Sequence, residues 1–335
     1  MKRAPPPHLL FESFPDQDVI MLWTSGSNPA LKPVTNNMKI LVTGGSGFIG
    51  SHVVEHYQNR AEVIVLDDLR TGHRKNLDGL KCRFVEGSIL DRALVDEVMD
   101  GVDYVVHLAA LVSVPESMSL PGETVNINVH GLLNVLESAR RHGVKKLCFA
   151  SSAAVYGENP AQPKVESMAP DPRSPYAITK LDGEYYCGLY AREGWLATAC
   201  LRFFNVFGPR QDPNSAYAAA VPIFLRRARD HEPITIYGDG GQTRDFIYVK
   251  DIVGALAFAA ETPEASGVFN AGYGSTLSIG GLVREILDLT GSRSEVRHEP
   301  VRAGDIRHST SDPSKLMALG WKPGFDVASG LRRMI

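Results

Sequence analysis

The sequence predicts a doubly wound α/β fold, and two observations carry this prediction. From residue 38 onward, short apolar runs rich in Val, Ile and Leu alternate with longer segments of helical periodicity. The first run leads directly into a glycine-rich turn, residues 43–50 (TGGSGFIG), which opens a helical segment. Apolar strands without polar alternation are typical of a parallel sheet that helices cover on both faces.

The predicted elements alternate along the chain as this fold requires. The expected strands are 39–43, 62–66, 83–86, 103–107, 145–150 and 197–203, and the expected helices between them are 47–58, 92–99, 125–141 and 176–192. After residue 205 the pattern loosens into segments that contain Gly and Pro, with two further helices at 251–261 and 278–290. We expect this part to form a smaller mixed α/β lobe over the carboxyl edge of the sheet, where ligands bind in open α/β folds.

Composition excludes several classes of protein. The 335 residues are 44% hydrophobic and 22% charged, which is typical of a globular chain of one large or two closely joined domains. The formal net charge of -3, without a long basic run, argues against a nucleic acid or an anionic membrane as partner. The four cysteines show no C-x-x-C spacing, so we expect free thiols, a cytoplasmic protein and no metal site.

The glycine turn predicts a dinucleotide site. Gly44, Gly47 and Gly50 follow a strand and open a helix, so they supply a tight turn, a close approach to a pyrophosphate and close helix packing. Asp67 ends the second strand about 20 residues later, where a carboxylate binds the ribose 2′-hydroxyl and therefore favours NAD. The nearby cations Arg70, Arg74 and Lys75 leave room for NADP.

This turn also sets the expected domains. We expect residues 38–204 to form a Rossmann domain that binds NAD, with 246–272 returning to it. Residues 205–245 and 273–335 are expected to form the smaller lobe. The turn-rich residues 1–37 are predicted to be a disordered extension, because their only apolar run, 19–23, is too short for a signal peptide or a membrane span.

A second motif predicts hydride chemistry. Tyr176 and Lys180 stand four residues apart on a predicted helix, so the phenol and the ammonium share one face. Such a pair is often mere surface packing, but here it follows a hydroxyl-rich strand end that contains Ser152. A nearby ammonium favours the phenolate, so Tyr176 is a candidate general base for an alcohol, with Ser152 bonded to the same hydroxyl.

Seven stretches, in this order along the chain, occur together in one enzyme family. They are 43–52 (TGGSGFIGSH), 107–110 (HLAA), 149–157 (FASSAAVYG), 175–180 (PYAITK), 202–209 (RFFNVFGP), 244–247 (RDFI) and 302–305 (RAGD). On these stretches residues 38–323 resemble the extended short-chain dehydrogenase/reductase family, and within it the nucleotide-sugar 4-epimerases of the UDP-galactose 4-epimerase type. The resemblance implies an NAD-dependent isomerase of UDP-sugars, with Tyr176, Lys180 and Ser152 as its catalytic residues.

The resemblance also implies the residues that hold the two ligands. Besides the glycines, Asp67, Tyr176 and Lys180, those expected at the cofactor are Phe48, Ile49, Ser88, Ile89 and Ala109. Those expected at the substrate are Asn205, Arg244 and Arg302 on the diphosphate, Asp305 on the nucleoside ribose, and Ser113 and Ser309. Ser88 departs from the family pattern, which usually has an aspartate that reaches the adenine amino group, so cofactor affinity is expected to be lower.

Two alanines distinguish the expected reaction. The family's 4,6-dehydratases carry an acidic pair just after the hydroxyl residue of this strand end, and its decarboxylases carry one glutamate there. In this chain the positions are Ala153 and Ala154. The resemblance therefore implies oxidation and reduction at the same carbon, which is epimerisation at C4 through a 4-keto sugar.

Two further departures bear on the sugar. Val112 stands where some epimerases place a lysine, and Ser309 stands where epimerases limited to sugars without an acetyl group have a tyrosine. Both departures resemble the branch that acts on N-acetylated sugars, so UDP-GlcNAc and UDP-GalNAc are the expected pair, with some activity on UDP-glucose and UDP-galactose.

Other functions remain open at this point. The same enzyme class includes UDP-glucuronate and UDP-xylose 4-epimerases and NAD-dependent sugar reductases. A different class is a non-catalytic sensor that binds a dinucleotide, although a sensor does not need Tyr176, Lys180 and Ser152 together. We also expect a homodimer formed by helices 125–141 and 176–192, through the apolar residues Leu132, Leu133, Val135, Leu136, Tyr185, Tyr186 and Leu189; the alternative is that these residues face the sheet.

Overall fold

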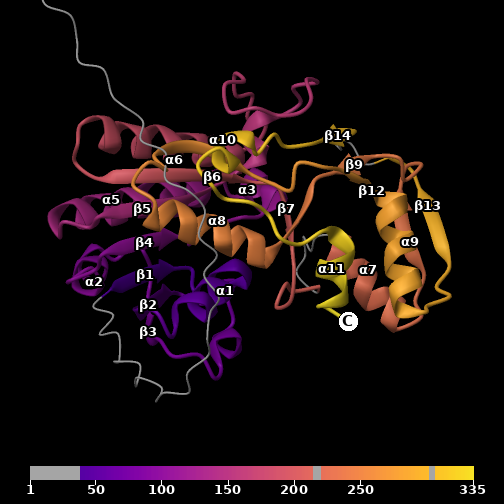
Figure 1. The fold of residues 1–335 in the computed structure, drawn as a ribbon, viewed down its shortest axis with the longest axis horizontal. Helices are drawn as coiled ribbons and strands as arrows, with labels where there is room; N and C mark the ends of the chain where they lie inside the picture. The colour runs from indigo at the N-terminus through magenta and orange to yellow at the C-terminus, as the bar shows by residue number, and fades with distance from the viewer. Residues whose placement is uncertain (1–37, 214–219, 302–305) are drawn as a thin grey trace, which may run out of the picture. The chain divides into compact units, whose positions relative to one another are not determined.

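A seven-stranded parallel sheet organises the protein (Figure 1). The computed structural model describes residues 38–213, 220–301 and 306–335, and the expected extension 1–37 lies outside them. The strand order is β11-β6-β5-β4-β1-β2-β3. The strands are β1 (Lys39–Thr43), β2 (Glu62–Asp67), β3 (Arg83–Glu86), β4 (Tyr104–His107), β5 (Lys146–Ser152), β6 (Ala197–Phe203) and β11 (Gly267–Ala271). The predicted fold class is confirmed.

Helices cover both faces of this sheet, as the all-apolar strands predict. On one face, α1 (Phe48–Tyr57) and α8 (Val249–Glu261) pack on Ile40 and Val42 of β1 in one core cluster. On the other face, Leu41 packs in a second cluster with residues of α2 (Arg92–Val98), α5 (Gly131–Arg141) and α6 (Pro175–Arg192). Successive residues of a strand point to opposite faces, which explains this division.

The single helix expected over 125–141 is continuous, but its first part is not a regular α-helix. The chain there forms α4 (Pro121–Val125), a π-helical turn η2 (Asn126–His130) and only then α5. The buried side chain of Asn128 accepts a hydrogen bond from Leu111 N–H at 2.7 Å and donates to Leu111 O and Thr179 Oγ1, both at 3.0 Å. These bonds hold the turn against the chain that leaves β4. Single π-helical turns of this kind occur inside α-helices.

The later part of the chain adds small sheets around a third core cluster. The first sheet pairs β7 (Asn205–Phe207) with β10 (Phe246–Tyr248), and the second pairs β8 (Ile234–Tyr237) with β13 (Val296–Glu299). The third has the order β12 (Leu277–Ser278), β9 (Thr243–Arg244), β14 (His308–Ser309). The cluster includes residues of α7 (Ala220–Arg229), α9 (Ile279–Thr290) and α11 (Val327–Arg332), and α10 (Ser314–Met317) packs near β11.

Candidate active site

The glycine turn between β1 and α1 has the geometry of a phosphate cradle. Gly44 has φ +70, and a Cβ there would lie 2.7 Å from Ala109 N; a Cβ on Gly50 would lie 2.1 Å from Gly44 O. Both positions therefore require glycine. The N-cap of α1 is Gly47, which offers no side chain to the first N–H groups of the helix. Those N–H groups have no partner within a helix, so they fit a pyrophosphate.

Asp67 lies beside this turn, at the end of β2. Its Oδ2 accepts from Ser46 N–H and its Oδ1 from Leu69 N–H, both at 2.8 Å. Burial raises the pKa of Asp67, and these two N–H bonds oppose the rise. Each carboxylate oxygen retains a lone pair, so the group fits ribose hydroxyls as an acceptor.

Two of the cations that left room for NADP are engaged elsewhere. Arg70 is bonded to Glu116 and Glu123, and the Arg74 guanidinium lies 4.0 Å from the centroid of the Phe84 ring. A 2′-phosphate near Asp67 would therefore meet a carboxylate without these two charges to offset it. The surroundings of Asp67 fit NAD.

The other residues predicted at the cofactor have mixed positions. Ala109 N–H donates to Thr43 Oγ1 at 3.3 Å directly beside Gly44. Phe48 and Ile49 form the first turn of α1. Ser88 Oγ accepts from Leu90 N–H at 3.2 Å, and Ile89 is buried in the core, where Gly131 leaves room for its side chain.

The structure brings the three predicted catalytic residues together. Ser174 caps α6 by accepting from Ala177 N–H at 3.2 Å, which places Tyr176 in the first turn of the helix. Ser152 ends β5, and its hydroxyl lies near enough to the Tyr176 phenol to lower the pKa of that phenol. Lys180, one turn further along α6, donates to Ala150 O at 2.7 Å. The end of β5 and the start of α6 thus form one polar site.

Burial controls the ionisation of this site. Burial raises the pKa of Tyr176, and the neighbouring Ser152 hydroxyl opposes that rise. Burial lowers the pKa of Lys180 to about 8; its ammonium lies 5.7 Å from the Tyr176 ring centroid and 4.9 Å from that of Phe149. A buried amine bonded to one carbonyl is costly for folding, which is typical of a functional lysine.

A buried ion pair supports the same helix one turn further on, and the sequence did not reveal it. Glu184 accepts from Arg202 Nε at 2.8 Å and Nη2 at 2.7 Å, and from Ser151 Oγ at 2.5 Å. Arg202 of β6 is in register with Ser151 of β5. The pair therefore ties α6 to the strand end that carries Ser152.

Three of the predicted substrate residues lie on the small strands that follow the main sheet. Arg244 of β9 is in register with Ser309 of β14, and Arg244 Nη1 donates to Thr243 O at 2.9 Å. Asn205 begins β7 and donates through Nδ2 to Asp245 O at 3.1 Å. Ser113 caps α3 (Val114–Ser119) by accepting from Glu116 N–H at 3.1 Å. The predicted residues Arg302 and Asp305 lie outside the described residues.

Asp245, the neighbour of Arg244, fixes these strands. Its fully buried carboxylate accepts from Tyr273 N–H, Gly274 N–H and Ser311 N–H at 2.8, 3.0 and 3.0 Å, and from Ser311 Oγ at 2.5 Å. Asp245 N–H donates to Ser309 O at 2.9 Å. The Asp245 backbone thus holds the Ser309 carbonyl, while the Asp245 carboxylate fixes Ser311, two residues further along the chain.

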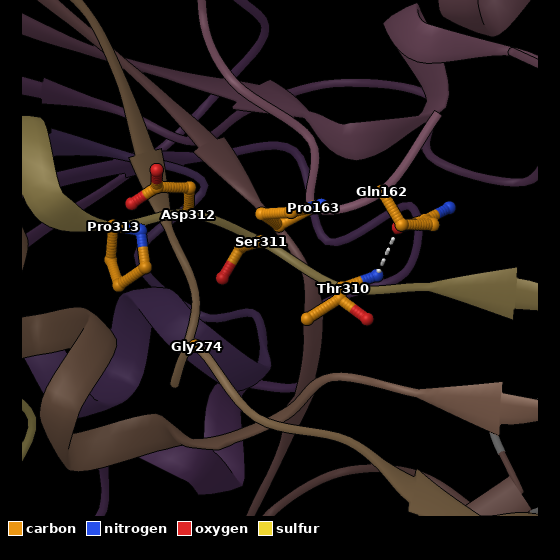
Figure 2. Close-up of a pocket in the computed structure, with 7 residues that line it drawn as sticks. All are labelled: Gln162, Pro163, Gly274, Thr310, Ser311, Asp312 and Pro313. Carbon is orange, nitrogen blue, oxygen red and sulfur yellow. Dashed lines mark hydrogen bonds between the residues drawn. The ribbon is translucent and has the colours of Figure 1, made fainter. Parts of the chain in front are cut away.

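A cavity of about 390 Å³ opens directly after Ser309 (Figure 2). Figure 2 shows the hydrogen bond across it from Thr310 N–H to Gln162 Oε1, 2.9 Å long. Gln162 also donates to His308 O at 2.7 Å. The segment that follows Tyr156 is thereby joined to β14. The lining residues are Gln162, Pro163, Gly274, Thr310, Ser311, Asp312 and Pro313.

Other expectations concern the cysteines, metals and membranes. All four cysteines, Cys82, Cys148, Cys187 and Cys200, are free thiols. Within residues 38–213, 220–301 and 306–335, no cluster of His, Cys, Asp or Glu is suited to a metal ion. No helix of the described chain has both the length and the apolar character needed to span a bilayer.

Known proteins are similar to this chain in sequence and in fold. Residues 40–272 match the NAD dependent epimerase/dehydratase family. A protein of Methanocaldococcus jannaschii named putative UDP-glucose 4-epimerase is 38% identical over 299 residues, which cover 88% of this chain and 97% of that protein.

Two solved structures are similar over nearly the same span. The UDP-N-acetylglucosamine 4-epimerase of Methanobrevibacter ruminantium, in complex with UDP-N-acetylmuramic acid, is 39% identical with a TM-score of 0.86 and covers 89% of this chain and 96% of its own. The UDP-glucose 4-epimerase of Thermus thermophilus, in complex with NAD, is 38% identical with a TM-score of 0.81 and covers 89% and 97%. The chain therefore belongs to the NAD-dependent epimerase/dehydratase family and is an NAD-dependent enzyme.

Proposed function

We propose that this enzyme is a nucleotide-sugar 4-epimerase that interconverts UDP-GlcNAc and UDP-GalNAc, with some activity on UDP-glucose and UDP-galactose. The observation that carries the proposal is the end of β5, where Ser152 meets Tyr176 and is followed by Ala153 and Ala154. This site holds a base for an alcohol without a carboxylate at the two positions that drive elimination or decarboxylation in related enzymes.

The residues of the chain divide the work at C4. Tyr176 takes the proton of the 4-hydroxyl and later returns it, while the Ser152 hydroxyl holds the same oxygen. NAD, when bound, supplies a positively charged nicotinamide that accepts the hydride from C4 and returns it. Lys180 lowers the cost of the Tyr176 phenolate through its positive charge. The 4-keto sugar turns about its phosphate linkage, so that hydride returns to the opposite face.

The nearby carboxylate of Glu184 does not support elimination or decarboxylation. Both of its oxygens are bonded to Arg202, one of them also to Ser151, and its side chain is 3% exposed. A carboxylate whose two oxygens are engaged in these bonds, and which is closed off from solvent, is not free to contact a leaving group. Epimerisation therefore remains the chemistry that this site supports best.

Ser309 supports the choice of sugar. It is half-buried in β14 and has a short side chain, which leaves volume beside the strand that carries Arg244. The Methanobrevibacter ruminantium structure, a UDP-N-acetylglucosamine 4-epimerase, is among the similar proteins. We propose that Asn205, Arg244 and Arg302 bind the diphosphate, Asp305 the ribose, and Ser113 and Ser309 the sugar. We also propose the division into an NAD-binding domain, 38–204 with 246–272, and a substrate lobe, 205–245 with 273–335.

A panel of sugar nucleotides tests the proposal. The purified enzyme, with and without added NAD, is incubated with UDP-GlcNAc, UDP-glucose, UDP-glucuronate and UDP-xylose, and the products are identified by mass spectrometry and NMR. We expect UDP-GalNAc and UDP-galactose at unchanged mass. Loss of water or carbon dioxide, or turnover of UDP-glucuronate or UDP-xylose alone, would contradict the proposal.

We further propose a homodimer, on a surface that differs in part from the one expected from the sequence. Leu132, Val135 and Leu136 are fully buried and face the sheet, so they cannot form a contact between subunits. Tyr185 of α6 is 63% exposed. Other exposed apolar residues on α6 and on α3 and α4, which pack on it, are Val114, Met118, Val125 and Ile178.

Charge on this apolar face is expected to separate the subunits. Tyr185→Glu and Met118→Glu should convert a dimer of the wild type into a monomer, because a carboxylate is costly to bury in an apolar interface. Light scattering measures the mass. Leu319→Glu, at an exposed leucine outside these helices, is the control and should stay dimeric. A monomeric wild type at working concentration would count against the proposal.

A further inference from the structure

Arg70 forms an ion-pair bridge between two connections that are far apart in the sequence. Its Nη2 donates to Glu116 Oε1 of α3 at 3.0 Å, and its Nη1 donates to Glu123 Oε1 of α4. Arg70 lies three residues after the end of β2, whereas Glu116 and Glu123 follow β4. One guanidinium thus joins the chain that leaves β2 to the chain that leaves β4.

The sheet order places this bridge across the glycine turn. β1 lies between β2 and β4, and the glycine turn leaves the carboxyl end of β1. Parallel strands end at the same edge of a sheet, so a link from the β2 connection to the β4 connection passes the end of β1. A dinucleotide that extends from Asp67 at β2 to Tyr176 beyond β4 runs along this same edge.

Two hydrogen bonds fix the backbone directly before Arg70. Leu69 has φ 58, which is uncommon for a residue other than glycine. Asp67 Oδ1 accepts from Leu69 N–H at 2.8 Å, and Asp68 Oδ1 accepts from Arg70 N–H at 3.1 Å. Two carboxylates therefore fix a left-handed turn that no glycine relieves, and one of them is the carboxylate predicted to bind the ribose.

We propose that the bridge of Arg70 with Glu116 and Glu123 is a strap that retains NAD by closing the edge of the sheet over the bound dinucleotide. The strap must open before the cofactor leaves, so it slows release. This inference goes beyond the proposed epimerisation, although it suits a reaction that regenerates NAD in each turnover. Cofactor release requires no sugar nucleotide, so failure of the strap and failure of the proposed reaction are distinguishable.

The release rate of NAD tests the strap. Holoenzyme with bound NAD is diluted into excess isotope-labelled NAD, and the unlabelled NAD that remains bound is followed by mass spectrometry. Arg70→Met should release NAD about 3- to 10-fold faster, the range expected for two partly exposed ion pairs. The double variant Glu116→Gln with Glu123→Gln should release it equally fast, and adding Arg70→Met to that variant should have no further effect.

The control is Arg83→Met. Arg83 pairs with Glu97 at 3.5 Å and is the first residue of β3. It lies at the amino end of its strand, whereas the strap follows the carboxyl ends of the strands, so its removal should leave the release rate unchanged. Equal rates in the wild type and Arg70→Met would overturn the strap. Fast release from Arg70→Met together with wild-type or slower release from the double glutamine variant would also overturn it, because Arg70 would then act on the cofactor phosphates directly.

Discussion

Tyr176→Phe is expected to lower turnover roughly 10²–10⁴-fold while NAD stays bound, because it removes the proton acceptor and leaves the ring in place. The phenol is the group of α6 that meets Ser152, the last residue of β5. Turnover is measured by NMR on UDP-GlcNAc, and bound NAD by mass spectrometry. Tyr185→Phe, an exposed tyrosine on the same helix, is the matched control and should keep wild-type turnover. Activity of Tyr176→Phe within a few-fold of the wild type would remove Tyr176 from the mechanism.

Activity and stability of a Lys180 variant, measured together, separate a catalytic role of this residue from a structural one. Lys180→Ala should lower turnover and weaken NAD retention, since the ammonium is expected to act on the phenolate and on the cofactor. Its pKa of about 8 lies below the usual value of 10.5, so the unfolded chain binds this proton more tightly than the folded one. The ammonium therefore costs stability most fully below about pH 8, and the cost disappears as pH rises past the unfolded pKa. Loss of activity with an unchanged or higher unfolding temperature at pH 7 would identify a functional role.

Much of the sheet could be predicted because its strands are apolar runs bounded by turn residues. β1, β3 and β6 begin and end at the predicted residues. The glycine turn and the meeting of Tyr176 with Ser152 were also predictable, because parallel strands bring their carboxyl ends to one edge. The local sequence pattern and this single rule of topology are enough to predict the glycine turn and the place where Tyr176 meets Ser152.

The contacts that depend on distant side chains could not be predicted. The helix expected over 125–141 contains a π-helical turn because Asn128 bonds to Leu111 and Thr179. Periodicity does not register a side chain that bonds outside its own helix. The partners of Arg70 stand 46 and 53 residues away in the sequence.

The same limit applies to the substrate strands. Arg244 and Asp245 are adjacent in one motif. The Asp245 carboxylate is the one that holds neighbouring segments in place, through its bonds to Tyr273, Gly274 and Ser311. Which member of a polar pair faces the interior depends on the strand register, and two-residue strands carry too little alternation to reveal it.

Ser309→Tyr is expected to change substrate preference, because a ring at this position would occupy the volume proposed for the acetamido group. The catalytic efficiency for UDP-GlcNAc should fall by roughly 10²-fold relative to that for UDP-glucose, since steric overlap rejects the larger ligand and spares the smaller. The strand should tolerate the change. Tyrosine suits an extended backbone, and Ser309 is held through its carbonyl, which accepts from Asp245 N–H at 2.9 Å.

Ser309→Ala is the matched variant, because it removes the hydroxyl and keeps the space. If volume alone admits the acetamido group, Ser309→Ala should retain the preference of the wild type; if the hydroxyl bonds that group, the efficiency for UDP-GlcNAc should fall by about 10-fold. Measurement of kcat/KM for both sugars in all three proteins separates the two causes. An unchanged ratio in Ser309→Tyr would mean that Ser309 does not line the sugar site, and the choice of an N-acetylated substrate would then lose its support while the roles of Tyr176 and Ser152 would stand.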